Sequence, residues 1–277
     1  RLQIIAANPD GAAYSVYKAL QGNPVDISAL ALAVQVEARR GDAVKADVAL
    51  KALSAKYPNA IETARASADL AMSRGQFSSA IAGYTKLLTR EENTGNALAL
   101  VTAHMAAGDA GKASAFLEAW VKRHTDDRLA QKALAESQFR AGQLAAAKES
   151  YRRVIASTPE DAISINNYAN LLLQMNDPLA QEVAEQALKL SPNNSAYADT
   201  LGWILVSKGQ NEAGLRYLRE ARLRSPENGE FRFHLAYALA KIGRNEEARD
   251  EMRAAVANWG GAAHNPMFSQ LKTELGI

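Results

Sequence analysis

The sequence predicts an all-α protein in which helix-turn-helix units follow one another as a solenoid. Three series of residues support this prediction, because within each series the spacing is 33 or 34 residues, or a sum of such spacings where a slot is skipped. Prolines stand where the second helix of a unit would end, glycines where its two helices would join, and small residues where its second helix would begin. Because a single unit cannot bury its apolar stripes alone, each unit needs its neighbours.

The joining residues are the most informative of the three series. Asn176 occupies the one slot without glycine, and asparagine is the residue that best replaces glycine where the backbone turns left-handed. We therefore expect a left-handed turn at every slot of this series. The glycines are Gly41, Gly75, Gly108, Gly142, Gly209 and Gly243, the prolines are Pro24, Pro58, Pro159, Pro192 and Pro226, and the small residues are Ala46, Ala80, Ala113, Ala147, Ala180, Gly214 and Ala248.

The unit from 195 to 226 is the clearest copy. Its first half places apolar or small residues at spacings of three and four, which puts them on one helical face. Its second half does the same, and a proline then ends the helix. The inward residues of this unit are Ala198, Leu201, Gly202, Leu205, Gly214, Leu218 and Ala221, and the closing proline is Pro226.

The same phase divides the whole chain into one continuous solenoid domain. Residues 1–26 form a truncated repeat with a second helix at 9–21, residues 27–262 form seven full repeats, and residues 263–277 form a capping helix. In the cap, Pro266 fits the first turn, and Met267, Leu271 and Leu275 give the apolar stripe. The seven repeats begin near Ile27, Ile61, Thr94, Arg128, Ala162, Ser195 and Gly229.

This pattern of small and apolar residues resembles the tetratricopeptide repeat (TPR), and the seven inward residues and the closing proline of the unit at 195–226 occupy its signature slots. The resemblance covers nearly the whole chain. It implies a right-handed superhelix whose first helices line a concave groove, which is the usual binding surface of the family.

Composition excludes several classes of protein. Lys and Arg total 32 against 30 acidic residues, so a net charge of +2 argues against nucleic acid as a partner and gives no polybasic membrane patch. The longest apolar run, 97–107, is too short to span a bilayer. Zero cysteines exclude disulfides and thiolate metal sites, and this composition fits either the cytoplasm or the periplasm. The chain starts without methionine inside a broken repeat, so we expect it to be cut from a longer protein, and any signal peptide or lipid anchor upstream would lie outside this segment.

No group of residues predicts catalysis, a metal or a cofactor. The histidines lie in different repeats without the spacing of a metal or nucleophile motif, so we expect them to be ordinary helix and loop residues. We therefore expect no enzyme activity. The four histidines are His104, His124, His234 and His264.

The resemblance directs the search for a binding site to the concave face of the first helices. Asparagines there can hold a peptide backbone through both a donor and an acceptor, and aromatic rings supply contact area at low entropy cost. For each ring, packing between repeats is an equal alternative, and for the asparagines a solvated face or an N-cap is the alternative. The predicted groove residues are Asn166, Asn170, Asp199, Trp203, Phe233, Tyr237, Lys241, Lys132 and Arg140.

The C-terminal third carries a narrower resemblance, through the run 199–203 and the repeat residues after it. It is similar to the ending of bacterial envelope TPR lipoproteins of the PEP-CTERM/exosortase system. This resemblance implies a non-catalytic scaffold, either periplasmic or anchored in the outer membrane, that binds a protein or peptide. It also implies a link to exopolysaccharide production and protein sorting. One alternative is the regulatory TPR portion of a larger glycosyltransferase or peptidase. Another is a polysaccharide-binding module that stacks sugars on the groove aromatics.

Overall fold

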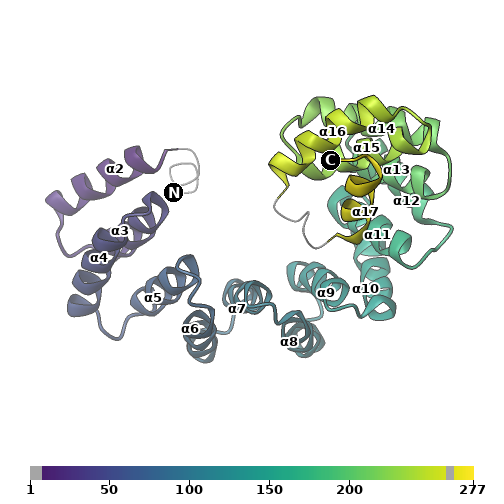
Figure 1. Ribbon diagram of the computed structural model, residues 1–277. Helices are drawn as coiled ribbons and strands as arrows, with labels where there is room; N and C mark the ends of the chain where they lie inside the picture. The colour runs from purple at the N-terminus through teal and green to yellow at the C-terminus, as the bar shows by residue number, and fades with distance from the viewer. Residues whose placement is uncertain (1–7, 260–264) are drawn as a thin grey trace. The chain divides into compact units, whose positions relative to one another are not determined.

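The computed structural model describes residues 8–259 and 265–277, and every regular element in this part of the chain is an α-helix (Figure 1). The all-α prediction is thereby confirmed. Contacts divide the chain into two compact units, Arg1–Gly142 and Gln143–Ile277. The predicted scheme of a truncated repeat, seven repeats and a cap in one continuous domain stays a prediction. Residues 1–7 of the truncated repeat and the boundary at 262 lie outside the described residues.

The first helix of each repeat begins at the residue that the sequence analysis predicts as the repeat start. Five of the seven first helices have an Asp or Asn N-cap whose side chain accepts a backbone N–H of the first turn, which satisfies a donor that has no partner within the helix. The first helices are α3 (Ile27–Arg40), α5 (Ile61–Ser73), α7 (Thr94–Ala106), α9 (Arg128–Arg140), α11 (Ala162–Gln174), α13 (Ser195–Ser207) and α15 (Gly229–Lys241).

The second helices alternate with the first ones along the chain, and one further helix stands at each end. Successive helices pack against each other within each unit, as α3 does with α4 and α13 with α14. The second helices are α4 (Ala43–Lys56), α6 (Phe77–Arg90), α8 (Ala110–Arg123), α10 (Leu144–Ser157), α12 (Ala180–Leu190), α14 (Asn211–Arg224) and α16 (Asn245–Asn258); the end helices are α2 (Pro9–Gly22) and α17 (Pro266–Glu274).

The residues that join the two helices of a repeat are left-handed, as predicted. The six glycines have φ between 69° and 79°, and Asn176, which stands in the slot without glycine, has φ 54°. The N–H after the left-handed residue then reaches back past the end of the first helix, as Gln210 N does to Leu205 O at 2.9 Å. This hydrogen bond satisfies one of the last carbonyls of the helix and ends it.

The small residues at the start of the second helices allow close helix packing. The alanines of this series are at most 1% exposed. In the repeat formed by α13 and α14 the helices come closer still, because a Cβ on Gly214 would lie 2.6 Å from the carbonyl oxygen of Gly202. Glycine at position 214, where the other repeats of this chain have alanine, is therefore a packing requirement.

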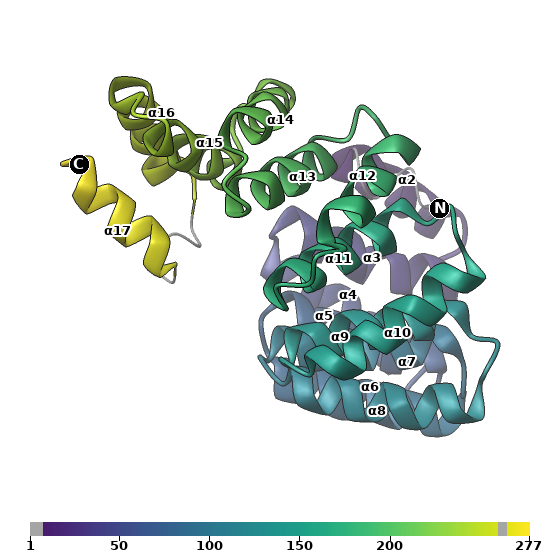
Figure 2. The same cartoon turned by 90° about the vertical axis from the view of Figure 1, so that its right-hand side faces the viewer.

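The helix α17 covers the apolar end of α15 and α16 (Figure 2). Its buried side chains are Phe268 and Leu271, and Leu275 directly after it is buried too, so the three keep the helical spacing of three and four. Met267, which the sequence analysis placed in the stripe, is 38% exposed, because it lies one position away from this face. The cap is also held by Arg249, whose Nε donates to Leu275 O at 2.9 Å.

None of the helices in the described part of the chain has the length and apolar character needed to cross a membrane.

Candidate functional site

The predicted groove residues fall into two sets. Seven lie on α11, α13 and α15, which are neighbouring first helices of the second unit. Lys132 and Arg140 lie on α9, in the first unit. The seven residues of the second unit therefore lie on one set of neighbouring helices.

Three of these residues form a cluster at the surface, here called the aromatic platform. It consists of Trp203 on α13 with Tyr237 and Lys241 on α15. The two rings meet edge to face with centroids 5.2 Å apart, and the Lys241 ammonium lies 5.0 Å from the centre of the Tyr237 ring. Trp203 and Tyr237 are partly buried and Lys241 is exposed, so the platform offers aromatic area and a positive charge to solvent.

A buried ion pair supports the platform from beneath. The His234 ring stacks on Trp203 with centroids 4.2 Å apart, and its Nδ1 lies 2.8 Å from Asp199 Oδ2. Burial lowers the pKa of His234, but the negative charge of Asp199 and its hydrogen bond outweigh burial, so the net pKa is raised. The contact with Asp199 fixes the His234 ring, which in turn holds the Trp203 ring in place. Asp199 is buried in this role and presents no carboxylate to a ligand.

Phe233 lies in the core and outside the platform. It is 0% exposed and packs against Trp259 and Phe268, with ring centroids 5.4 Å and 5.3 Å away. The sequence left open whether this ring faces the groove or packs between elements. In the structure it packs between elements. The reason is that α17 covers the end of α15.

The two asparagines of α11 are also less exposed to solvent than a pair that binds a peptide would be. Asn166 is only 7% exposed, and its Oδ1 is buried without a hydrogen-bond partner among the described residues. Asn170 is partly buried and its Nδ2 lies 3.4 Å from Thr200 Oγ1 on α13. Asn166 is in the middle of α11, so the N-cap alternative does not hold. Of this pair, Asn170 is the one nearer to solvent.

In the first unit, neighbouring first helices enclose two hollows. A hollow of about 440 Å³ between α7 and α9 has apolar walls that include Leu98 and Met105. Arg140, a predicted site residue, stands at this hollow and pairs with Glu136 at 3.0 Å. Lys132 is partly buried on the same helix and does not line the hollow.

The second hollow, of about 360 Å³, lies along α3 and α5 and contains a carboxylate that the sequence analysis missed. Asp69 accepts hydrogen bonds from Gln35 Nε2 at 3.2 Å and from the Tyr84 hydroxyl at 2.7 Å. Burial and the neighbouring Asp69 raise the pKa of Tyr84, so its hydroxyl stays protonated and donates.

A separation of about one repeat was the signal that could have identified these pairs. Gln35 and Asp69 are 34 residues apart, and Asp199 and His234 are 35 apart. In a tandem array such separations place side chains at the same level of neighbouring first helices. His234 therefore has a specific partner, whereas the sequence analysis expected an ordinary helix residue. His264 lies outside the described residues.

The described residues, 8–259 and 265–277, contain no group of three His, Asp or Glu side chains that could hold a metal ion.

Comparison with known proteins gives matches to one kind of repeat. Three models described as tetratricopeptide repeat match residues 71–136, 133–161 and 200–263, which together cover more than half of the chain. A TPR repeat-containing protein of Pseudomonas aeruginosa, PA4667, is 33% identical over 87 residues. That match covers 31% of this chain and 15% of the relative, so the chain spans a small part of the relative's length.

Solved structures with the same fold are distant in sequence. The Cut9 and Hcn1 hetero-tetramer of the APC/C contains a chain that matches 97% of this chain over 53% of its own length, with 15% identity and a TM-score of 0.66. A tetratricopeptide repeat protein from Parabacteroides merdae matches 84% of this chain and 93% of its own, with 15% identity and a TM-score of 0.63. The TPR protein TTC0263 of Thermus thermophilus matches 65% of this chain and 96% of its own, with 20% identity and a TM-score of 0.53. The repeat phase, the left-handed turns, the family models and these folds agree, and the chain is built from tetratricopeptide repeats.

Proposed function

We propose that the chain is a non-catalytic scaffold that holds an extended segment of a partner protein against the first helices of its repeats. Tetratricopeptide repeats generally bind protein partners. The observation that carries the proposal for this chain is the aromatic platform, where Trp203 and Tyr237 stay partly exposed although their neighbours on α13 and α15 are buried.

The platform has the properties of a binding surface for a peptide. The rings give contact area with few rotatable bonds, so little entropy is lost when a ligand binds. Their position is fixed before binding, because the buried pair of His234 and Asp199 supports Trp203 from below. Lys241 adds a positive charge at the edge, which favours a segment that carries an acidic residue or a carbonyl oxygen there.

The test is recovery of partners from an envelope extract with the purified protein. We expect Trp203→Ala/Tyr237→Ala to recover less of the partners than the wild type, because it removes both rings. Trp203 packs against the core of its unit, so Lys241→Glu is the second variant: it changes an exposed charge without touching that core. Tyr217→Ala is the matched control, because it removes a partly exposed ring on the second helix α14. Equal recovery by all four proteins would rule out the platform as the binding site.

We also propose a place for the scaffold in the bacterial cell envelope, beside exopolysaccharide production and exosortase-dependent sorting. The support is the run from Asp199 to Trp203 and the repeat residues after it, which are similar to TPR lipoproteins of that system. The membrane contact would then come from an anchor outside this segment. Fractionation of cells that express the complete reading frame tests this location. Recovery in the cytoplasm would contradict it.

A second candidate is the regulatory repeat portion of a larger enzyme. It is favoured by the length of the Pseudomonas relative, of which the match covers only 15%. The complete reading frame separates the two candidates: a catalytic domain supports the second, and a lipid-anchor signal with only repeats after it supports the scaffold. Polysaccharide is a further candidate ligand, because sugars can stack on the platform rings. Capture of purified exopolysaccharide by the wild type and its loss in the double-ring variant would assign the platform to sugar.

A further inference from the structure

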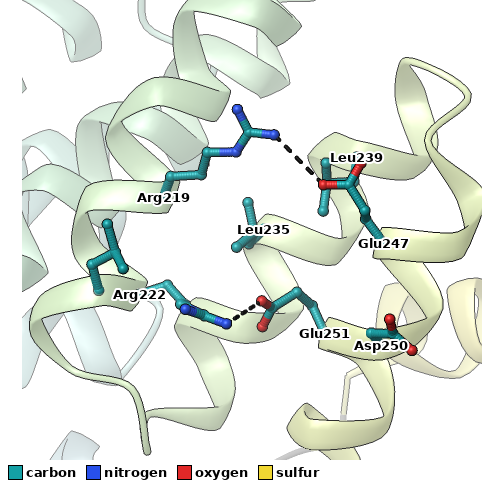
Figure 3. A pocket seen from close by; sticks show the side chains of 8 residues that line it. Arg219, Arg222, Leu235, Leu239, Glu247, Asp250 and Glu251 are labelled. Carbon is teal, nitrogen blue, oxygen red and sulfur yellow. Dashed lines mark ion pairs between the residues drawn. The ribbon is translucent and has the colours of Figure 1, made fainter.

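A pocket lies between α14, α15 and α16 in the second unit, and its charged side chains neutralise one another (Figure 3). Arg222 Nη2 lies 2.9 Å from Glu251 Oε1, and Arg219 Nη2 lies 3.8 Å from Glu247 Oε2. Both arginines of the pocket therefore have a carboxylate partner inside it. Because its charges are paired in this way, the pocket does not select a ligand of either charge.

The hollow between α3 and α5 in the first unit contains a carboxylate without such a partner. Asp69 is partly buried, and its partners among the described residues are two neutral donors, Gln35 Nε2 at 3.2 Å and the Tyr84 hydroxyl at 2.7 Å. Arg65, one turn earlier on α5, is directed elsewhere, since its Nη2 donates to Asn96 Oδ1 at 2.6 Å. An ionised carboxylate has about four acceptor sites. Asp69 can therefore accept hydrogen bonds from a further donor, and a cation would neutralise it.

The rest of the lining of this hollow is largely apolar. It includes the buried side chains of Val34, Ala66 and Leu70 and the partly exposed ones of Ala38 and Met72. Apolar walls beside a carboxylate suit a side chain with an aliphatic stem and a cationic end. Lysine has this chemistry, because its ammonium group carries three donors at the end of four methylene groups. The hollow measures about 360 Å³, so one such side chain fits into it.

The equivalent hollow between α7 and α9 contains a carboxylate that the chain itself neutralises. Glu136 holds the same place in α9 as Asp69 does in α5, and Arg140, one turn later, pairs with it at 3.0 Å. The residue one turn after Asp69 is Ser73, which is exposed and carries no charge. Its hydroxyl donates to Leu70 O at 2.8 Å. The hollow at Asp69 therefore lacks the cation that the equivalent hollow has.

Arg39 also lines the hollow, from the side of α3. It is exposed, and it is not among the described partners of Asp69. Water screens an exposed charge more than a partly buried one, so Asp69 has the stronger effect on a ligand inside the hollow. Removal of the Arg39 charge distinguishes a cationic ligand, which Arg39 repels, from an anionic one, which Arg39 attracts.

We propose that the hollow between α3 and α5 binds a lysine side chain of a partner protein. The aliphatic stem lies against Leu70 and Met72, and the ammonium donates to Asp69. This inference rests on the proposed function and deepens it, because it names a residue of the extended segment that the first helices hold. The hollow lies in the first unit and the aromatic platform in the second, so the two sites can be tested separately.

The test selects dodecapeptides from a random display library on the purified protein. We expect lysine to be enriched several-fold among the peptides that the wild type recovers. The enrichment is expected to disappear with Asp69→Asn, because asparagine keeps nearly the same shape but has no charge. It is expected to remain with Trp203→Ala/Tyr237→Ala, since these rings belong to the platform.

A selected peptide, labelled with fluorescein, then gives affinities by anisotropy. Asp69→Asn in the protein and norleucine in place of the lysine are each expected to weaken binding about tenfold or more. Each change removes a charge-assisted hydrogen bond and keeps the apolar contact. On the Asp69→Asn protein, norleucine is expected to have little further effect, because the contact is already missing.

Three further variants test the charges around the hollow. Ser73→Arg reproduces the arrangement of Glu136 with Arg140, so it is expected to neutralise Asp69 and weaken binding as Asp69→Asn does. Arg39→Gln removes a repulsive charge and is expected to tighten binding. Glu136→Gln is the matched control, because this carboxylate holds the equivalent place and is already paired, so unchanged affinity is expected. Circular dichroism and unfolding temperature check that each variant is folded.

The same experiments distinguish the alternatives. Recovery of peptides without lysine enrichment, or equal effects of Asp69→Asn and Glu136→Gln, would overturn this inference alone. Weaker binding by Arg39→Gln would overturn it too, because the ligand would then be an anion. Lysine enrichment that is lost in the double-ring variant and kept in Asp69→Asn would assign the lysine to the platform. Recovery of no peptide by any of the proteins would instead count against the proposed function.

Discussion

At Gly202 and Gly214 the backbones of α13 and α14 come so close that neither position has room for a side chain. A Cβ on Gly214 would lie 2.6 Å from the Gly202 carbonyl oxygen and 2.6 Å from Cγ2 of Val206. A Cβ on Gly202 would lie 2.8 Å from Cγ of Leu218. Such contacts can be relieved only if the helices move apart, so these glycines set the distance between the two helices.

Gly202→Leu and Gly214→Ala are each expected to lower the free energy of unfolding, by about 1 to 3 kcal/mol, through overpacking. The matched control is Gly111→Ala in α8, where no atom lies within 4 Å of the added Cβ. There, the change is expected to stabilise the protein by about 0.5 to 1 kcal/mol, because alanine loses less entropy than glycine in a helix. Urea unfolding measures the free energy of unfolding of all three variants against the wild type. A stabilising effect of Gly214→Ala would contradict the close approach.

The buried pair of His234 and Asp199 gives a stability that depends on pH. Burial alone would lower the pKa of His234, but the charge and hydrogen bond of Asp199 raise it above the ordinary value near 6.5. A raised pKa in the folded state means that the pair stabilises the fold fully below about pH 6.5. The stabilisation is lost as the pH rises through the folded-state pKa.

We therefore expect the free energy of unfolding of the wild type to exceed that of Asp199→Asn by more at about pH 6 than at about pH 9. Asparagine keeps a hydrogen-bond acceptor but removes the charge, so the pH-dependent part of the difference reports the ion pair. Denaturant unfolding across this pH range measures it. A difference that stays constant with pH would mean that Asp199 does not shift the pKa of His234.

At the scale of elements, α17 decides which residues of α15 face solvent. Its Phe268 closes over Phe233 with ring centroids 5.3 Å apart, while Met267, the residue before it, is exposed. The end of a solenoid needs such a cover because the last repeat has no further repeat to bury its apolar face.

Phe268→Ala is expected to cost about 3 to 5 kcal/mol in the free energy of unfolding of this end of the chain, because it leaves a cavity above Phe233. Met267→Ala, the adjacent exposed position, is expected to change it by less than about 0.5 kcal/mol. Hydrogen exchange locates the effect: amides of α15 and α16 lose protection in Phe268→Ala, and those of α11 and α12 keep it. Uniform loss along the second unit would show that its repeats unfold as one body.

At the scale of the whole molecule, contacts in each unit join helices that are near in sequence. This is why the repeat phase alone predicted the helix starts and the left-handed turns, including the one at Asn176. The candidate site was less predictable, because the burial of a side chain depends on the helices packed against its repeat. The order of residues within α15 does not reveal that α17 covers Phe233 or that His234 meets Asp199. The link to the envelope stays a prediction, since it depends on the run near Trp203 and the repeat residues after it.

The left-handed joints at a constant phase also bear on how such a gene changes length. When one repeat is duplicated or lost, the turn of one repeat replaces the turn of another that has the same left-handed backbone conformation. The product therefore keeps its helix boundaries. Recombination between neighbouring repeats is therefore a low-cost route to longer or shorter relatives. Positions that differ from their counterparts, such as Gly214, mark where a copy has become specialised and is no longer interchangeable.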